Sequence, residues 1–377
     1  MKNKFLALIL TVAIICGAIL PSLTLTARAA EVVDSGDCGT NVTWVLDSTG
    51  TLTISGSGEM HNYERYENPW YSHRNQIKKI FIENGVTSIG HFAFSGCNVL
   101  TSITIPLSVT SIGNSAFDSC VALTDIAIPS SVTSVGDYSF FECTGLTAIT
   151  IPNSMTSIGN CAFYRCTGLT IVTIPESVTS IGVAAFSGCT SLTDIKVDPG
   201  NSSYCAQNGV LFDKDFAALL CYPAGKTDST YAIPNGVTGI GGSAFEVCTD
   251  LTGVTIPDSV TYIADTAFSG CTSLTSVTMP NRITSIEQDT FSDCTSLVDI
   301  TIPSSVTRIG SSAFSGCTEL KEITIPDGVR YIGYSAFGYC YGLTNITIPE
   351  SVMSIDDDAF SNCTGLTSIL IPDSVTS

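Results

Sequence analysis

The sequence predicts a β-rich repeat solenoid with one parallel strand per coil and short 3₁₀ or helical turns. Three residue types recur with a period of 23 residues: a proline that follows isoleucine, a phenylalanine, and a cysteine three residues after each phenylalanine. Three residue types in one register indicate a true internal repeat, and a repeat of this length is typical of stacked solenoid coils. The repeated phenylalanines are Phe94, Phe117, Phe140, Phe163, Phe186, Phe245, Phe268, Phe291, Phe314, Phe337 and Phe360.

Each part of the repeat suits one part of a coil. Segments such as LTSITIP (residues 100–106) are short, β-branched and alternating, which favours a strand. Proline ends the strand where no further donor is needed, and glycine in SVTSIG permits a bend. AFSGC is too short for a regular helix and indicates a single 3₁₀ or helical turn. One coil cannot bury its apolar face alone, so successive coils must stack into a continuous core.

The pattern CxxLxxIxIPxxVxxIGxxAF, across residues 77–377, resembles the BspA-like class of bacterial leucine-rich repeats. The resemblance implies a leucine-rich-repeat solenoid on a secreted or surface protein, often one that adheres to host proteins or to other cells. The arithmetic of the repeat predicts the solenoid by itself. Adhesion is implied by the resemblance alone.

Cysteine occupies an inward position of every regular coil, and the chain has 16 cysteines. Buried cysteine behaves as a small apolar residue with a weak donor, so we expect a ladder of reduced thiols. Disulfides are the alternative in an exported protein, although parallel side chains in register do not converge as a disulfide requires. A metal ladder is disfavoured because the ligand spacing of zinc sites is absent.

The first 30 residues predict a secretory signal peptide. Lys2 and Lys4 precede a long apolar run, and small residues around Ala29 offer a cleavage site after Ala29 or Ala30. The whole chain carries a formal charge of −19, and removal of this segment with its three cations leaves about −22. This charge disfavours nucleic acid as a partner, and no second apolar run predicts a transmembrane segment in the mature chain. We therefore expect a bacterial protein that is secreted or held at the cell surface.

Three segments depart from the repeat. Residues 31–76 do not repeat and predict an N-terminal cap with a β-hairpin, in which Trp44 and Trp70 cover the first coil. Residues 198–227 predict a hairpin insertion with a turn near 213–215, where Cys205 and Cys221 could pair. The solenoid, 77–377, stops in mid-coil at Ser377, so we expect its last coil to be incomplete. We favour a truncated sequence over an apolar end that meets another chain.

The sequence shows no catalytic, cofactor or metal motif. His61, His73 and His91 lack ligand spacing, and the acidic run 356–358 lacks the spacing of a calcium loop. Outward strand positions are mostly threonine and serine, which strand propensity explains more simply than a polysaccharide- or ice-binding face. These observations predict a protein that is not an enzyme and needs no cofactor.

Aromatic residues at positions outside the repeated core are the candidates for partner binding, because tyrosine is favoured at interfaces. Partial burial of these rings through drift of the repeat is the alternative. We expect binding of an extracellular protein or a cell-surface ligand, with a glycan as a further option. A second hypothesis makes the chain the binding or spacer part of a larger exported enzyme, and a third makes it a spacer only. The candidates are Tyr331, Tyr334, Tyr339, Tyr341, Tyr138, Phe141 and Tyr164.

Overall fold

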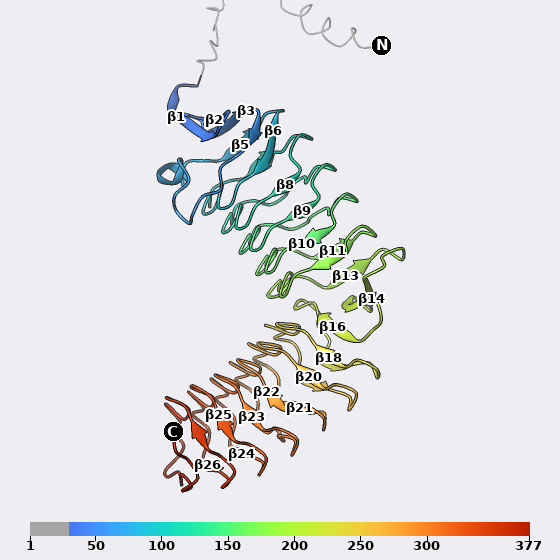
Figure 1. The fold of residues 1–377 in the computed structure, drawn as a ribbon, viewed down its shortest axis with the longest axis vertical. Helices are drawn as coiled ribbons and strands as arrows, with labels where there is room; N and C mark the ends of the chain where they lie inside the picture. The colour runs from blue at the N-terminus through green and yellow to red at the C-terminus, as the bar shows by residue number, and fades with distance from the viewer. Residues whose placement is uncertain (1–29) are drawn as a thin grey trace, which may run out of the picture. The chain divides into compact units, whose positions relative to one another are not determined.

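Short parallel strands, contributed one coil after another, build the molecule. The computed structural model describes residues 30–377, and Val32–Ser377 form one unit. Within this unit the coils stack in chain order, as Figure 1 shows. The predicted solenoid fold is confirmed. The predicted signal peptide lies outside the described residues, apart from its last position.

The first column of strands follows the leucine of each repeat. Its members pair in parallel at an offset of one repeat, as in Ile80 with Ile103 and Val254 with Val277. Ile80 and Val254 are turned inward and the residues beside them, including the apolar Phe81, are turned outward, as strand alternation requires. The strands are β5 (Lys79–Ile82), β7 (Ser102–Thr104), β11 (Ile171–Ile174), β13 (Asp194–Val197), β17 (Thr230–Ala232), β19 (Gly253–Thr255), β21 (Ser276–Thr278), β24 (Glu322–Thr324) and β26 (Asn345–Thr347).

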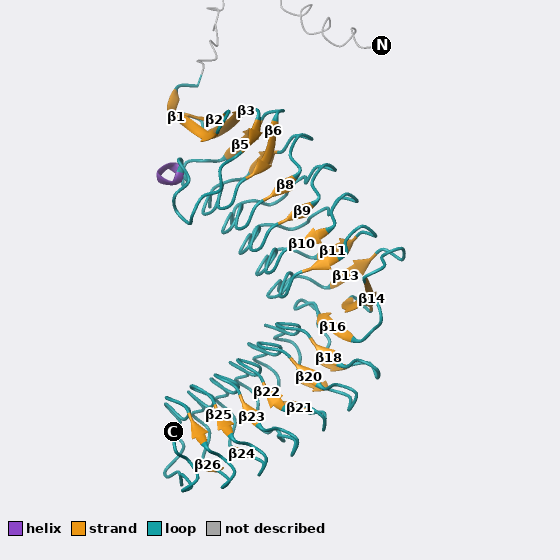
Figure 2. Cartoon of the chain, in the orientation of Figure 1, coloured by secondary structure: helices purple, strands orange, loops and turns teal. Residues whose placement is uncertain are grey.

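A second column of strands, which was not predicted from the sequence, precedes the glycine that most repeats have after this strand (Figure 2). Most of its members have two residues, which is too short for alternation to be recognised in a sequence. They also pair in parallel, as in Ile112 with Val135. They are β4 (Gly58–Glu59), β6 (Val86–Ile89), β8 (Ser111–Ile112), β9 (Ser134–Val135), β10 (Ser157–Ile158), β12 (Ser180–Ile181), β18 (Gly239–Ile240), β20 (Tyr262–Ile263), β22 (Ser285–Ile286), β23 (Arg308–Ile309), β25 (Tyr331–Ile332) and β27 (Ser354–Ile355).

The AFSGC-like turns differ in detail from the helical turns that we expected. Two left-handed residues four positions apart bound each turn, as at Ser115 (φ 52°) and Ser119 (φ 60°). Alternate N–H groups of the turn point out of the coil, and the N–H of Phe117 donates to Ser139 O of the next coil at 2.8 Å. Within residues 30–377 the one 3₁₀ helix is η1 (Tyr71–His73), which lies before the first regular coil.

The repeated phenylalanines form a column of stacked rings in the core. The ring of Phe140 lies 5.2 Å from the rings of both Phe117 and Phe163, at interplanar angles of 9° and 4°. Trp70 extends the column at its start, because its ring stacks on Phe94 at 5.6 Å. The column is interrupted after Phe186, where the buried side chains divide into two hydrophobic clusters.

The non-repeating start of the unit covers the first coil. Strands β1 (Val32–Gly39), β2 (Val42–Asp47) and β3 (Thr51–Gly56) are antiparallel, and β3 pairs in parallel with β5. Trp44 packs edge-on against Trp70 at 5.6 Å, and both side chains are buried. Burial of these rings is the packing that a cap requires.

The insertion adds an antiparallel sheet between the two hydrophobic clusters. Its strands are β14 (Tyr204–Gln207), β15 (Val210–Asp213) and β16 (Ala218–Cys221). The connection from β15 to β16 begins at Asp213, within the turn expected from the sequence. β16 then pairs in parallel with β18, so that the insertion rejoins the second column of strands.

The cysteines of the repeat form a ladder of thiols that donate to backbone carbonyls. Cys120 Sγ lies 3.3 Å from Phe94 O, and Cys143 Sγ lies 3.1 Å from Phe117 O, one coil back in each case. Every cysteine in the described part of the chain is a free thiol, including Cys205 and Cys221 of the insertion. The cysteine is therefore a small core side chain that also gives a buried carbonyl a second donor.

Candidate binding surface

Three of the seven aromatic candidates meet on the surface of two neighbouring coils. The ring of Phe141 stacks on that of Tyr164 at 5.2 Å and 7°, and the ring of Tyr138 lies 5.7 Å from that of Phe141. Tyr138 is 45% exposed, and the other two rings are half-buried. We call these three residues the aromatic patch.

The aromatic patch departs from its own column of the solenoid. Phe141 and Tyr164 each follow a core phenylalanine, a position that elsewhere holds small or acidic residues. The other members of this column are Ser95, Asp118, Ser187, Glu246, Ser269, Ser292, Ser315, Gly338 and Ser361. Since the core does not need a ring here, the patch supplies exposed aromatic area beyond what the fold requires.

Charged groups surround the patch. The Arg165 guanidinium lies 5.2 Å from the centre of the Tyr164 ring, and its Nη1 lies 3.6 Å from Glu142 Oε1. The Tyr164 hydroxyl donates to Glu246 Oε1 at 2.5 Å. Tyr164 precedes the insertion in the chain and Glu246 follows it. Burial and this acceptor raise the pKa of Tyr164, so its hydroxyl stays protonated at neutral pH. Cys161 and partial burial likewise raise the pKa of Tyr138.

The other four candidates all lie on one coil, around β25. Tyr334, Tyr339 and Tyr341 are about half-exposed, and the rings of Tyr339 and Tyr341 meet edge-on at 6.3 Å. Tyr331 is less exposed, and its hydroxyl donates to Asp356. This hydrogen bond is the main cause that raises the pKa of Tyr331. In the described part of the chain, no ring contact joins these tyrosines to the aromatic patch.

Arg165, Glu142 and Glu246 were not predicted from the sequence as neighbours of the patch. Glu142 and Arg165 occupy equivalent positions one repeat apart, so the repeat register could have paired them. Glu246 is 82 residues from Tyr164. No periodic signal could have found that contact, because it depends on the path of the insertion.

The hydroxyl groups of the outward threonines donate hydrogen bonds to backbone carbonyls within the solenoid. The hydroxyl of Thr101 donates to Lys78 O at 3.1 Å, and that of Thr275 donates to Thr252 O at 2.9 Å. Both acceptors lie one coil back, 23 residues earlier. Their hydroxyl protons are thus engaged within the protein, which agrees with the simpler explanation given from the sequence.

The described residues hold no cluster of three or more histidine, cysteine or acidic side chains that could bind a metal. His73 Nε2 lies 3.1 Å from Asp34 Oδ2, which makes it a partner of the N-terminal strand. Between residues 30 and 377, no helix has the length and apolar character needed to cross a membrane.

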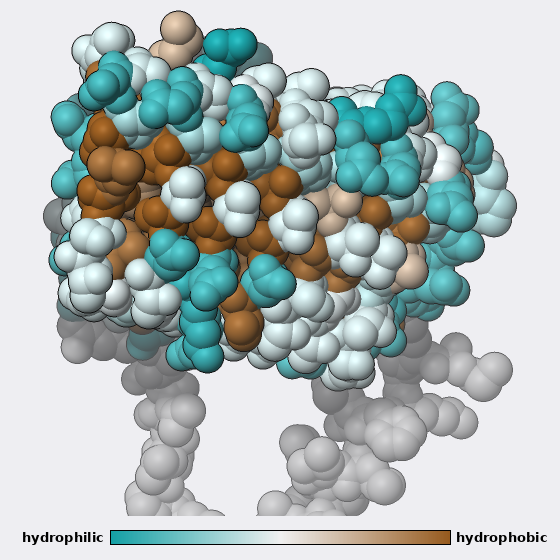
Figure 3. All heavy atoms as spheres, turned by 90° about the horizontal axis from the view of Figure 1, so that it is seen from below, coloured by the Kyte–Doolittle hydropathy of each residue, from teal (hydrophilic) through white to brown (hydrophobic). Residues whose placement is uncertain are grey.

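Hydrophobic side chains also gather on the face shown in Figure 3, which is the lower end of the unit in Figure 1. The last residues contribute exposed apolar side chains, among them Leu370 at 83% exposure and Ile371 at 45%. These residues are distant in sequence from the aromatic patch.

The comparison with known families decides the class of this protein. A model described as the BspA type leucine rich repeat region matches residues 66–193, 226–341 and 291–377. The chain belongs to this family. The resemblance inferred from the repeat is therefore confirmed.

Solved structures of this BspA-type chain's relatives share its fold. A leucine-rich repeat protein from Eubacterium ventriosum is 28% identical, with a TM-score of 0.76 over 91% of this chain and 97% of that one. A leucine rich cell surface protein from Faecalibacterium prausnitzii is 31% identical, with a TM-score of 0.61 over 89% and 95%. The pneumococcal vaccine antigen PcpA is 21% identical, with a TM-score of 0.59 over 92% and 93%. No protein of curated function matches the chain.

Proposed function

We propose that this BspA-type repeat protein is exported and displayed at the bacterial cell surface, where it binds a macromolecular partner and has no catalytic role. The partner is an extracellular protein or another cell-surface molecule. The Faecalibacterium prausnitzii relative, itself described as a cell surface protein, supports the location. The predicted signal peptide supports export.

One observation carries the binding proposal: Phe141 and Tyr164 stack at a position where most other coils have serine, and the exposed ring of Tyr138 contacts Phe141. Tyrosine and phenylalanine give a partner large contact area with few rotatable bonds. The rigid stack of coils holds these rings in a fixed arrangement, so little side-chain entropy is lost when a partner binds. The tyrosines around β25 offer a second, separate contact.

Binding is tested by screening the purified protein against arrays of extracellular proteins and of glycans. For any partner found, the double substitution Tyr138→Ser with Phe141→Ser is expected to weaken binding about thirtyfold, which corresponds to a hot-spot loss of about 2 kcal/mol. Tyr262→Ser is the matched control, because Tyr262 is also half-exposed but lies in β20, on a coil that follows the insertion.

A second double substitution, Tyr334→Ser with Tyr339→Ser, tests the coil around β25 in the same way. If both double variants bind every partner as tightly as the wild type, the rings are not the contact surface. A protein that binds nothing on either array would instead be a spacer.

Export has its own test. The N-terminal sequence of the protein recovered from its native cells is expected to begin at Ala30 or Glu31, after cleavage of the signal peptide. A protein that retains Met1 would contradict the proposed location.

A further inference from the structure

The ladder of hydrogen bonds between successive turns is broken at one place. In a regular coil, alternate N–H groups of the turn donate to the next coil, as Phe117 N–H does to Ser139 O. The equivalent N–H groups of Ala184, Phe186 and Gly188 have no hydrogen-bond acceptor among residues 30–377. Phe186 and Gly188 are buried, so these donors are not simply directed into solvent.

The break has a cause in the sequence. After Phe186 the chain enters the insertion, and the next ring of the core column is that of Tyr222, which stacks on Phe245 at 5.2 Å. No ring contact within the described residues joins Phe186 to Tyr222. The amide of Tyr222 donates forward to Ala244 O, so the solenoid resumes its ladder from this point.

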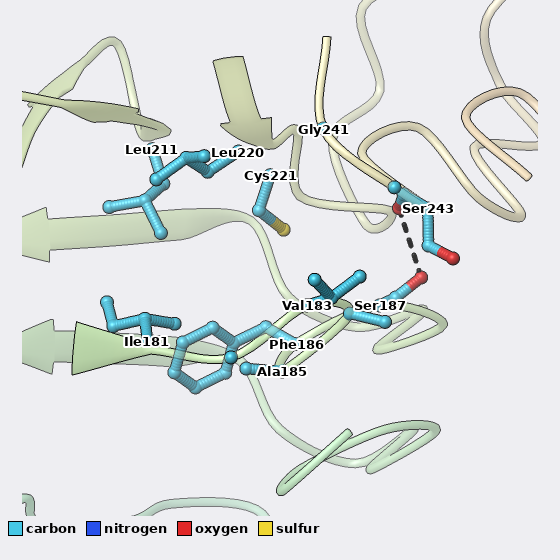
Figure 4. A pocket seen from close by; sticks show the side chains of 13 residues that line it. Ile181, Val183, Ala185, Phe186, Ser187, Leu211, Leu220, Cys221, Gly241 and Ser243 are labelled. Atoms are coloured by element: carbon cyan, nitrogen blue, oxygen red, sulfur yellow. Dashed lines mark hydrogen bonds between the residues drawn. The ribbon is translucent and has the colours of Figure 1, made fainter. Parts of the chain in front are cut away.

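A cavity of about 90 Å³ lies at the break. Figure 4 shows Phe186 and Val183 on one side of it and Leu211, Leu220 and Cys221 on the other. Most of these side chains are apolar. The volume is several times that needed for one water molecule, and it suits a single small ring.

Two of the three unpaired donors, the N–H groups of Ala184 and Phe186, belong to residues that line this cavity. Ala184 (φ 56°) and Gly188 (φ 69°) are left-handed, as their counterparts are in the regular turns, where the N–H groups equivalent to those of Ala184, Phe186 and Gly188 all point to one side. In every regular coil that side is the side of the next coil, and here the cavity lies on it. Unpaired backbone N–H groups at the wall of a concavity can donate hydrogen bonds to a negatively polarised atom.

The carboxylate of Glu246 disfavours a negatively charged ligand in this cavity. Its Oε2 accepts a hydrogen bond of 2.8 Å from the hydroxyl of Ser187, which lines the cavity. Its Oε1 accepts one from the Tyr164 hydroxyl. A carboxylate in this position repels an anionic ligand. A neutral carbonyl oxygen can accept from the free N–H groups without that repulsion.

We propose that this cavity binds a small neutral ligand in which a carbonyl group is attached to an apolar ring. The ring packs against Leu211, Leu220 and Phe186, and the carbonyl oxygen accepts a hydrogen bond from the Phe186 N–H. The ligand thereby fills the interruption in the core and replaces part of the missing ladder. This inference is independent of the aromatic patch and of its partner.

Hydrogen–deuterium exchange, measured by mass spectrometry with benzamide as the probe, tests the proposal. Without a probe, residues 182–189 should exchange at least tenfold faster than residues 159–166, the equivalent segment of the preceding coil. Benzamide at ten times its Kd should slow the first segment about tenfold and leave the second unchanged. Toluene, which has the ring without the carbonyl, should have little effect, and benzoate should act more weakly than benzamide.

Variants link the effect to the cavity. A Cβ at Gly242 would lie 3.0 Å from Val183 Cγ1, so Gly242→Leu places a side chain at the cavity and should abolish the response to benzamide. Gly239→Leu is the matched control, because a Cβ there meets nothing within 4 Å, and it should keep the response. The proposal is overturned if residues 182–189 are as protected as 159–166 without any probe. It is equally overturned if benzamide has no effect on the wild type, or if toluene acts as strongly.

Discussion

Phe140→Ala removes a ring from the middle of the core column. Phe140 is fully buried, and it stacks on Phe117 and Phe163, both at 5.2 Å. Truncation of a buried phenylalanine costs about 3–5 kcal/mol. Loss of two stacked pairs, at about 0.5–1.5 kcal/mol each, places the expected cost near the upper end of that range. The gap cannot close readily, because the coils on both sides are held by backbone ladders.

Guanidinium unfolding followed by circular dichroism measures this cost, and Phe141→Ala is the matched control. Phe141 is the next residue and has the same side chain, but its ring is half-buried on the surface. We expect its truncation to cost about 1 kcal/mol. If Phe140→Ala destabilises the protein no more than Phe141→Ala, the ring column does not carry the stability assigned to it. A changed slope of unfolding with denaturant would indicate instead that the coils on either side of the substitution unfold separately.

Three further predictions follow from the same contacts. A Cβ on Gly159 would lie 2.4 Å from the backbone of Gly136 in the preceding coil, so Gly159→Ala should cost about 1–3 kcal/mol of unfolding free energy, whereas Gly239→Ala should be close to neutral. Burial raises the pKa of the Cys97 thiol from 9.0 to about 12. Each such thiol ionises first in the unfolded chain, so stability should be constant below pH 9 and fall by about 1.4 kcal/mol per pH unit and per thiol between pH 9 and 12. An unfolding midpoint that does not move over that range would contradict the thiol ladder. Tyr164→Phe removes the hydrogen bond to Glu246 across the insertion and should cost about 1–2 kcal/mol, measured by thermal unfolding at pH 7. An unchanged midpoint would mean that this hydrogen bond does not hold the two sides of the insertion together.

The repeat made the core predictable. A side chain that recurs every 23 residues must occupy the same place in each coil, so Phe117, Cys120 and their equivalents could be assigned to the interior from position alone. The second column of strands could not be assigned in this way. Its members are mostly two residues long, and they exist because the neighbouring coil supplies their hydrogen-bond partners.

The candidate surface was predictable only in part. The aromatic residues stand out in the sequence as departures from the template, and the register places Phe141 directly beside Tyr164. The role of Arg165 and Glu142 beside them follows from the same register once the fold is known. The register does not predict the contact of Tyr164 with Glu246, because the insertion separates Glu246 from the patch in the chain.

The sequence by itself determined the stacked coils, the inward positions and the column of cysteines, because a strict period carries each local contact unchanged from one coil to the next. Only the tertiary structure decided what happens where that period is lost. The contact of Tyr164 with Glu246 and the unpaired amides at Phe186 both depend on where the insertion returns to the solenoid. That path is set by contacts between residues far apart in the chain, which no local pattern records.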